Sequence, residues 1–332
     1  MILIKSIRLG VLLFGLFVIN NFVSEGSIPL DTTFTLQRAL NTIKGNYPNA
    51  KIVPSIVPSN VRAEFNLVYT TLKNTPYGDR DLQLDIFRPK KEGKFPALIM
   101  IHGGGWRSGN KIMEHPMAEL VAAKGYVTIP VEYRLSLEAK YPNAVFDIKA
   151  AIRWIKANAD KYSVDTTRIA IEGNSAGGQL AALVGMTNGI AKFEGAEGIT
   201  AGTSNVQAVV DIDGVLDFLA PGSLNLVRKP DSPDCAWLGG CFTEKPETWK
   251  EASSIFWVSK NSIPIVFITS SQPRFTAGMS EMIDLLNQNG IYSERHNIEG
   301  SPHTFWLFDP WFEPTVSYMV SYLNRVFYKP NH

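Results

Sequence analysis

The stretch Arg168–Val184, with sequence RIAIEGNSAGGQLAALV, contains the feature that decides the fold. The apolar residues before Gly173 predict a buried strand, and the apolar residues after Gly178 predict a helix. Ser175 therefore lies at a sharp strand-to-helix turn, where flanking side chains would collide. Glycines at positions 173 and 177 relieve that crowding and leave the Ser175 hydroxyl exposed above a sheet. The G-x-S-x-G pattern in this context predicts a nucleophilic serine.

A second glycine-rich motif follows another predicted strand. Residues 95–101 read FPALIMI, which predicts a fully buried strand, and HGGGW follows at residues 102–106. Three consecutive glycines present backbone N–H groups with no side chains in the way. An ester carbonyl that becomes a tetrahedral oxyanion needs such donors. We therefore expect the N–H groups of Gly103, Gly104 and Ala176 to form an oxyanion hole.

The HGGGW and GNSAGG motifs, in this order, resemble those of the α/β-hydrolase superfamily. Within it the chain is similar to the esterases related to hormone-sensitive lipase and to the bacterial feruloyl and acetylxylan esterases. The resemblance covers roughly residues 65–328. It implies an α/β-hydrolase fold and a serine carboxylesterase that needs no metal and no organic cofactor.

The pattern of the remaining chain is typical of the same fold class. Predicted strands alternate with predicted helices, which indicates a mostly parallel central sheet with helices on both faces. Besides the two strands above, the expected strands are residues 65–72, 82–88, 126–133, 206–212, 264–270 and 292–298. The expected helices, besides the one that follows Ser175, are residues 111–124, 142–160, 277–289 and 316–326.

Length and composition fit one large α/β domain. The chain has 332 residues, of which 45% are hydrophobic and 19% charged, and its net charge is +1. This balance favours neither nucleic acid nor an anionic membrane as a partner. We expect a signal peptide at residues 1–26, a lead-in segment at residues 27–63 and a catalytic domain at residues 64–332. Within the domain, residues 218–260 break the alternation of elements and are expected to form a small cap that shapes the substrate pocket; a surface excursion is the alternative.

The first 26 residues have the layout of a secretory signal. Lys5 and Arg8 precede the apolar residues 9–19, and Ser24 and Gly26 follow at plausible cleavage positions. The apolar part is short for a transmembrane helix, so no stable membrane partner is expected, although an uncleaved anchor is an alternative. We expect an exported protein, either periplasmic or secreted.

Cysteine usage agrees with export. Cys235 and Cys241 are the only two cysteines, and the glycines between them allow a small loop to close into a disulfide in an oxidising compartment. Two free thiols are the alternative. A zinc site is not expected, because no nearby histidine or further cysteine supplies the remaining ligands.

A serine nucleophile needs a base, and the chain has five histidines. The resemblance places the catalytic histidine on the loop between the last strand and the last helix, where His303 lies. His102 belongs to the HGGGW motif and is expected to orient that loop. His115 and His332 are expected to be solvated, and His296 is expected at a surface or sheet edge.

The acid is where this chain departs from the family pattern. The resemblance implies an aspartate directly after the strand at residues 264–270, but the sequence there is SSQPRF, without a carboxylate. We favour Asp213, at the end of the strand before it. Asp211 lies on the same face of that strand, but Asp213 is nearer the carboxyl end, where sites of parallel sheets form.

Two alternatives for the acid stay open. One is a carboxylate that flanks the histidine loop, either Glu299 or Asp309. The other is a Ser–His dyad without a carboxylate, assisted by Ser271, Gln272 or a backbone carbonyl. Because the acid fixes the histidine tautomer and stabilises the imidazolium, a dyad would be slower.

The resemblance implies a carbohydrate ester as substrate, with acetyl, feruloyl or methyl groups on plant xylan or pectin. Trp106, Arg274 and Trp306 are the expected substrate-binding residues. The aromatic run at residues 305–312 can stack on sugar rings, or else pack the last helix onto the sheet. A guanidinium at Arg274 can hold a carboxylate such as that of galacturonate, or else form a structural salt bridge. A general small-ester or lipid esterase and a non-catalytic carbohydrate-binding pseudo-hydrolase are the alternative functions.

Overall fold

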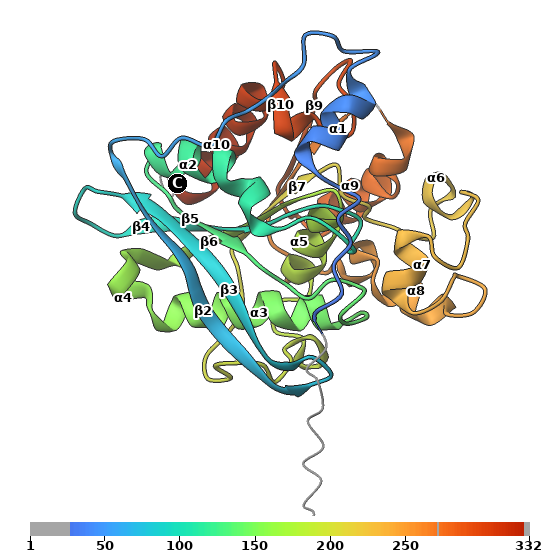
Figure 1. Ribbon diagram of the computed structural model, residues 1–332, viewed down its shortest axis with the longest axis horizontal. Coiled ribbons are helices and arrows are strands. Elements are labelled where there is room, and N and C mark those ends of the chain that lie inside the picture. The colour runs from blue at the N-terminus through green and yellow to red at the C-terminus, as the bar shows by residue number, and fades with distance from the viewer. Residues whose placement is uncertain (1–26, 271, 329–332) are drawn as a thin grey trace, which may run out of the picture.

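An eight-stranded sheet forms the centre of the computed structural model, which describes residues 27–270 and 272–328 (Figure 1). The strand order is β2-β3-β5-β4-β6-β7-β8-β9. The pairs β2–β3 and β3–β5 are antiparallel, and all other neighbours in the sheet are parallel, which confirms the predicted fold class. The strands are β2 (Val61–Thr75), β3 (Gly78–Pro89), β4 (Phe95–Ile101), β5 (Val127–Val131), β6 (Val164–Asn174), β7 (Ala208–Ile212), β8 (Ile265–Thr269) and β9 (Ser293–Asn297).

Helices cover both faces of this sheet. Successive residues of a strand point to opposite faces, and in β4 Ile99 belongs to one apolar core whereas Leu98 and Met100 belong to the other. The first core contains side chains of α3, α5 and α9, and the second contains side chains of α1, α2 and α10. These helices are α1 (Leu36–Ile43), α2 (His115–Ala123), α3 (Asn143–Ala157), α5 (Ala176–Met186), α9 (Met279–Gln288) and α10 (Phe312–Tyr328).

Two predicted helices are each divided in the structure. The helix expected at residues 111–124 consists of a 3-10 turn, η1 (Lys111–Glu114), and of α2, because Pro116 lies in the first turn of a helix and begins a new one. The helix expected at residues 142–160 is α3 followed by the short α4 (Ala159–Tyr162). The other predicted elements are present with shifted ends, and the hairpin of β2 and β3 is longer than expected.

The lead-in segment lies against the C-terminal part of the domain. It contains α1 and the short strand β1 (Lys51–Ile52), which pairs antiparallel with β10 (Phe308–Asp309) just after the histidine loop. Asp31 forms an ion pair with Arg107, next to the HGGGW motif. The predicted signal peptide at residues 1–26 lies outside the described residues. Among the helices of residues 27–270 and 272–328, none has the length and apolarity required to span a membrane.

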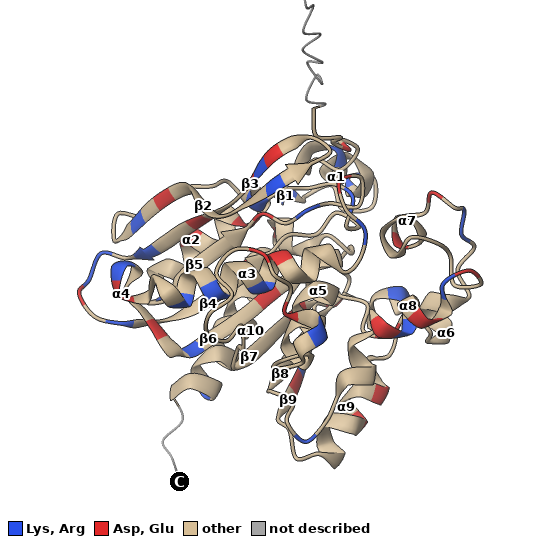
Figure 2. Ribbon diagram, turned by 90° about the horizontal axis from the view of Figure 1, so that it is seen from below, with Lys and Arg blue, Asp and Glu red and all other residues tan. Residues whose placement is uncertain are grey.

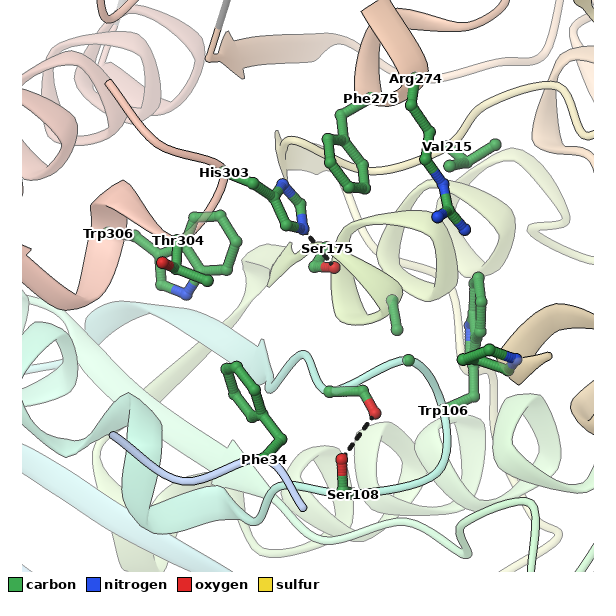
Figure 3. Close-up of a pocket in the computed structure, with 14 residues that line it drawn as sticks. Phe34, Trp106, Ser108, Ser175, Val215, Arg274, Phe275, His303, Thr304 and Trp306 are labelled. Carbon is green, nitrogen blue, oxygen red and sulfur yellow. Dashed lines mark hydrogen bonds between the residues drawn. The ribbon is translucent and has the colours of Figure 1, made fainter. Parts of the chain in front are cut away.

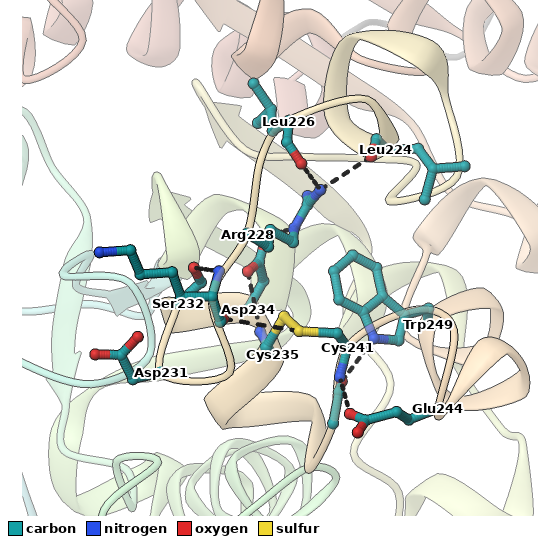
Figure 4. The surroundings of a disulfide bond; sticks show 12 residues. Leu224, Leu226, Arg228, Asp231, Ser232, Asp234, Cys235, Cys241, Glu244 and Trp249 are labelled. Atoms are coloured by element: carbon teal, nitrogen blue, oxygen red, sulfur yellow. Dashed lines mark hydrogen bonds and ion pairs between the residues drawn. A yellow bond between two sulfur atoms is a disulfide. The ribbon is translucent and has the colours of Figure 1, made fainter.

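The insertion at residues 218–260 packs beside α5 and contains the disulfide between Cys235 and Cys241 (Figure 4). Its tryptophan Trp237 is fully buried and stacks on Trp106, with ring centroids 4.9 Å apart, so the insertion is joined to the HGGGW loop. Acidic and basic residues are interspersed over the elements seen in Figure 2. The insertion consists of α6 (Pro221–Leu224), α7 (Pro233–Leu238), α8 (Pro246–Glu251) and η3 (Ser254–Trp257). The remaining short 3-10 turns are η2 (Ala191–Phe193), η4 (Pro273–Thr276) and η5 (Phe305–Leu307).

Candidate active site

Ser175 lies at the sharp turn between β6 and α5. Its backbone has φ 56° and ψ −118°, which is a strained conformation for a residue with a side chain. A Cβ atom at Gly173 would lie 2.1 Å from the carbonyl oxygen of Gly177, and one at Gly177 would lie 1.9 Å from that of Ile101. Only glycine therefore allows the turn to close this tightly, as the sequence pattern predicted.

His303 connects Ser175 to a carboxylate. Its Nε2 atom lies 2.9 Å from Ser175 Oγ, and its Nδ1 atom lies 2.9 Å from Asp213 Oδ2 (Figure 3 shows the contact with Ser175). A carboxylate accepts hydrogen bonds, so Nδ1 donates to Asp213 and Nε2 is left to accept the serine proton. The three side chains are thus placed as a nucleophile, a base and an orienting acid.

Asp213 reaches His303 from the end of β7. Its side chain is fully buried, and Oδ1 accepts a hydrogen bond of 2.7 Å from the backbone N–H of Ser270, directly after β8. The family pattern implies an acid at the end of β8. In this chain the end of β8 instead supplies the backbone N–H of Ser270, which holds Asp213 at the end of the neighbouring strand β7. Glu299 and Asp309 are both exposed, and neither forms a contact with His303 among the described residues. Ser271 lies outside the described residues.

Asp211 is a second buried carboxyl group on β7, two residues before Asp213. Burial and the nearby charge of Asp213 raise the pKa of Asp211 well above its ordinary value. Its Oδ1 accepts a hydrogen bond of 3.0 Å from the backbone N–H of Gly214. Asp211 makes no contact with His303 among the described residues, so Asp213 is the carboxyl group that orients the histidine.

The imidazole of His303 is enclosed by two aromatic rings. Phe275 stacks on it with ring centroids 3.3 Å apart, and Trp306 contacts it edge-on at 5.1 Å. Burial lowers the pKa of His303, the hydrogen bond and charge of Asp213 oppose this effect, and the charge of Arg274 adds to the lowering. His303 is therefore neutral, and able to act as a base, at a lower pH than an exposed histidine.

The prediction of the oxyanion hole was wrong at one residue. The backbone N–H of Gly103 donates a hydrogen bond of 3.1 Å to Asn174 Oδ1, so it is occupied. The N–H groups of Gly104 and Ala176 have no hydrogen-bond partner among the described residues, and both residues line the cavity beside Ser175. The N–H group of Gly105 also has no such partner in the described part of the chain, and Gly105 lines the same cavity. We therefore place the oxyanion hole at Gly104, Gly105 and Ala176, one position further along the HGGGW loop than predicted.

Asn174 is a site residue that the sequence reasoning missed. Its Nδ2 donates to both carboxylate oxygens of Glu114, at 3.0 and 3.1 Å, and to Oε1 of Glu172 at 3.4 Å. All three side chains are buried, and burial raises the pKa values of Glu114 and Glu172 above their ordinary range. These carboxyl groups hold the side chain of Asn174, which in turn accepts the hydrogen bond from the backbone N–H of Gly103. The signal in the sequence was Glu172, a carboxyl group that directly follows the apolar residues 169–171 of a predicted buried strand.

The other described histidines make no contact with Ser175 or Asp213. His102 Nδ1 contacts the carbonyl oxygen of Gly103 at 2.7 Å, and burial lowers the pKa of His102 to about 4, so it is neutral and donates within the loop. The expectation for His115 was wrong, because it is buried and contacts Asp85 Oδ2 at 2.8 Å. His296 is half-buried near the sheet edge, and His332 lies outside the described residues.

A cavity of about 270 Å³ opens above Ser175. Trp106 and Trp306 line it but are only 4% and 3% exposed, and the indole N–H of Trp106 donates to Gln179. The aromatic run at residues 305–312 therefore mainly packs the core, and the binding of substrate by Trp106 and Trp306 stays a prediction. The sequence reasoning missed Phe34 of the lead-in segment, which also lines the cavity.

The mostly parallel sheet, the strained serine turn and a Ser–His–Asp arrangement at the carboxyl ends of the strands define the α/β-hydrolase class. The chain belongs to the BD-FAE family, whose family model matches residues 84–275. This match includes the HGGGW motif, Ser175 and Asp213, but ends before His303.

Relatives and solved structures agree with this assignment. Esterase LipC of Mycobacterium tuberculosis is 32% identical over 208 residues, which are 61% of this chain and 51% of LipC. The chain thus spans about half the length of this curated relative. A structure titled "Truncated form of carbohydrate esterase from gut microbiota" has a TM-score of 0.69 and 26% identity, over 82% of this chain and 100% of that chain. A bifunctional GH43-CE protein of Bacteroides eggerthii has a TM-score of 0.67 and 27% identity, over 80% of this chain and 38% of that chain.

Proposed function

We propose that this protein is a serine carboxylesterase. The observation that carries the proposal is the pair of 2.9 Å contacts that His303 makes with Ser175 and Asp213. A serine hydroxyl is a weak nucleophile until a base takes its proton, and the orienting carboxylate keeps the base in the correct tautomer. Backbone N–H groups beside Ser175 that have no hydrogen-bond partner in the described part of the chain supply the other requirement, which is stabilisation of an oxyanion.

The mechanism follows from these positions. Ser175 Oγ attacks the ester carbonyl while His303 Nε2 accepts its proton, and the oxygen that becomes negative is held by the N–H groups of Gly104, Gly105 and Ala176. His303 then gives the proton to the leaving alcohol, which departs and leaves an acyl group on Ser175. Water, deprotonated by His303, attacks this acyl-enzyme and releases the acid.

The proposed substrate is a plant cell-wall polysaccharide, such as xylan or pectin, that carries acetyl, feruloyl or methyl esters. The similarity to the carbohydrate esterase from gut microbiota supports this class. A polymer of this kind requires an exported enzyme. The N-terminal signal pattern supports export, and so does the disulfide between Cys235 and Cys241, since such bonds persist mainly in oxidising compartments.

A general small-ester esterase is the second candidate function. The similarity to LipC, which is named only as an esterase, favours it. A cavity of about 270 Å³ also accepts small acyl groups without any polymer. The non-catalytic alternative loses its main argument, because Asp213 supplies the carboxylate that the loop after β8 lacks.

The experiment that tests the proposal measures acetate, methanol and ferulate released from acetylated xylan and from pectin. The control is the Ser175→Ala protein. Release by the unmodified protein alone supports a polysaccharide esterase and names the bond that it cleaves. Hydrolysis of aryl acetates without release from either polymer supports the general esterase, and no hydrolysis of any ester contradicts the proposed activity.

A further inference from the structure

Arg274 is the one strongly charged side chain in the described lining of the cavity above Ser175. It belongs to η4, between β8 and α9, and its side chain is 40% exposed. Figure 3 shows its guanidinium reaching down past Val215 on the Trp106 side of Ser175. Among the described lining residues there is no Asp or Glu that would repel an anion.

The guanidinium of Arg274 lacks a complete set of partners. Its Nε atom is buried and has no hydrogen-bond partner among the described residues. Asp234 forms the ion pair that was expected as the alternative role of Arg274, but its Oδ2 lies 3.8 Å from Nη2 of Arg274, beyond hydrogen-bond distance. The same Oδ2 accepts a hydrogen bond of 2.8 Å from Arg228 Nε.

Two guanidinium groups therefore share one carboxylate. Arg228 is tied to the cap by further hydrogen bonds to backbone carbonyls of Leu224 and Leu226 (Figure 4), whereas Arg274 faces the cavity. One positive charge is left without a matching negative charge at the cavity wall. A partly buried guanidinium in this state favours a planar anion that accepts two hydrogen bonds.

We propose that Arg274 forms a carboxylate-binding subsite beside Ser175, so that the preferred substrates are esters whose sugar carries a free carboxylate. An O-acetylated uronic acid has both groups on one ring, within the reach of a single cavity. The same uronic acid with its carboxyl group methylated is neutral and does not satisfy the guanidinium. This inference rests on the proposed esterase function and names its substrate class.

The test compares two substrates that differ only in charge. One is the methyl glycoside of O-acetylated galacturonic acid, and the other is the same glycoside with its carboxyl group converted to the methyl ester, with acetate release measured for both. We expect the unmodified protein to prefer the acid, and Arg274→Ala to lower the acid-to-ester ratio of kcat/KM by about 10- to 100-fold, the size of a lost charge-assisted pair. Arg274→Lys keeps part of the preference, because the charge stays but the bidentate geometry is lost.

Two further variants make the test specific. Arg62→Ala removes an exposed arginine of β2, away from the cavity, and should leave the ratio unchanged. Asp234→Asn removes the competing carboxylate and should raise the ratio, which a merely damaged fold would not do. An Arg274→Ala ratio equal to that of the unmodified protein overturns the inference, and so does an Asp234→Asn ratio that falls.

Binding separates this inference from the proposed function. Free galacturonate and free galactose are titrated into the Ser175→Ala protein by calorimetry, which needs no hydrolysis. Tighter binding of galacturonate that is lost in the Ser175→Ala, Arg274→Ala double variant supports the subsite even where no ester is cleaved. Equal affinity for the two sugars contradicts it even where neutral esters are cleaved.

Discussion

Replacement of Asp213 by Asn tests the assignment of the acid. The backbone of Asp213 has φ 52°, a conformation that asparagine tolerates as readily as aspartate. The amide oxygen of Asn can still accept the hydrogen bond from Ser270 N–H that Asp213 Oδ1 accepts at 2.7 Å. The amide nitrogen then faces His303 Nδ1. As a donor it favours the tautomer whose proton is on Nε2, which cannot accept the serine proton.

The size of the effect follows from the burial and the distance. Asp213 is fully buried and its Oδ2 lies 2.9 Å from His303 Nδ1, so the charge centres are roughly 4 Å apart. At an effective dielectric constant of about 20, the attraction between the carboxylate and the imidazolium formed during reaction is about 4 kcal/mol. Each 1.36 kcal/mol corresponds to about ten-fold in rate, so we expect kcat to fall by about 10³- to 10⁴-fold.

The assay is hydrolysis of 4-nitrophenyl acetate at saturating substrate, with circular dichroism to confirm that Asp213→Asn is folded. KM should change little, because the lost interaction acts on the transition state. Glu299→Gln and Asp309→Asn, which alter the exposed alternatives, are the matched controls and should keep their activity. Retention of most of kcat by Asp213→Asn, or a large loss in either control, refutes the assignment.

Three further predictions follow from individual contacts. Because burial and the Arg274 charge lower the pKa of His303, kcat/KM should rise with pH below the ordinary range of histidine, and Arg274→Ala should move this rise to higher pH. A profile that does not move contradicts this. Because burial raises the pKa of Glu114, the folded state holds an extra proton, and stability falls as pH rises from about 5 to about 8. Glu114→Gln should therefore flatten the fall of the melting temperature over this pH range. An unchanged slope of melting temperature against pH speaks against this reasoning. Gly177→Ala should abolish activity, because its Cβ would lie 1.9 Å from the Ile101 carbonyl oxygen, whereas Gly45→Ala, with open space around it, should be active.

The fold and the nucleophile could be predicted because their signals are local. The turn that carries Ser175 is determined by the glycines on either side of it, and the sequence shows them directly. The loop that carries His303 lies between two recognisable elements, and the family resemblance then indicated the histidine on it. Strand and helix ends were less accurate, because prolines such as Pro116 begin new helices where the apolar pattern continues.

The acid and the oxyanion hole depend on contacts between distant parts of the chain. Asp213 and His303 are 90 residues apart, and no local pattern indicates which strand end reaches the imidazole. Gly103 was misassigned because its N–H is taken by Asn174, 71 residues away. Trp306 lines the cavity but is only 3% exposed, because aromatic residues near a site are equally suited to the core, and its role in substrate binding stays a prediction.

The central claim is that Ser175 is a nucleophile activated by His303, and covalent labelling tests it most directly. The protein is incubated with a fluorophosphonate, and the modified peptide is identified by mass spectrometry. We predict one adduct, on Ser175, that is absent in Ser175→Ala and forms far more slowly in His303→Ala. No adduct on the folded protein, or an adduct that persists in Ser175→Ala, would contradict the proposed mechanism.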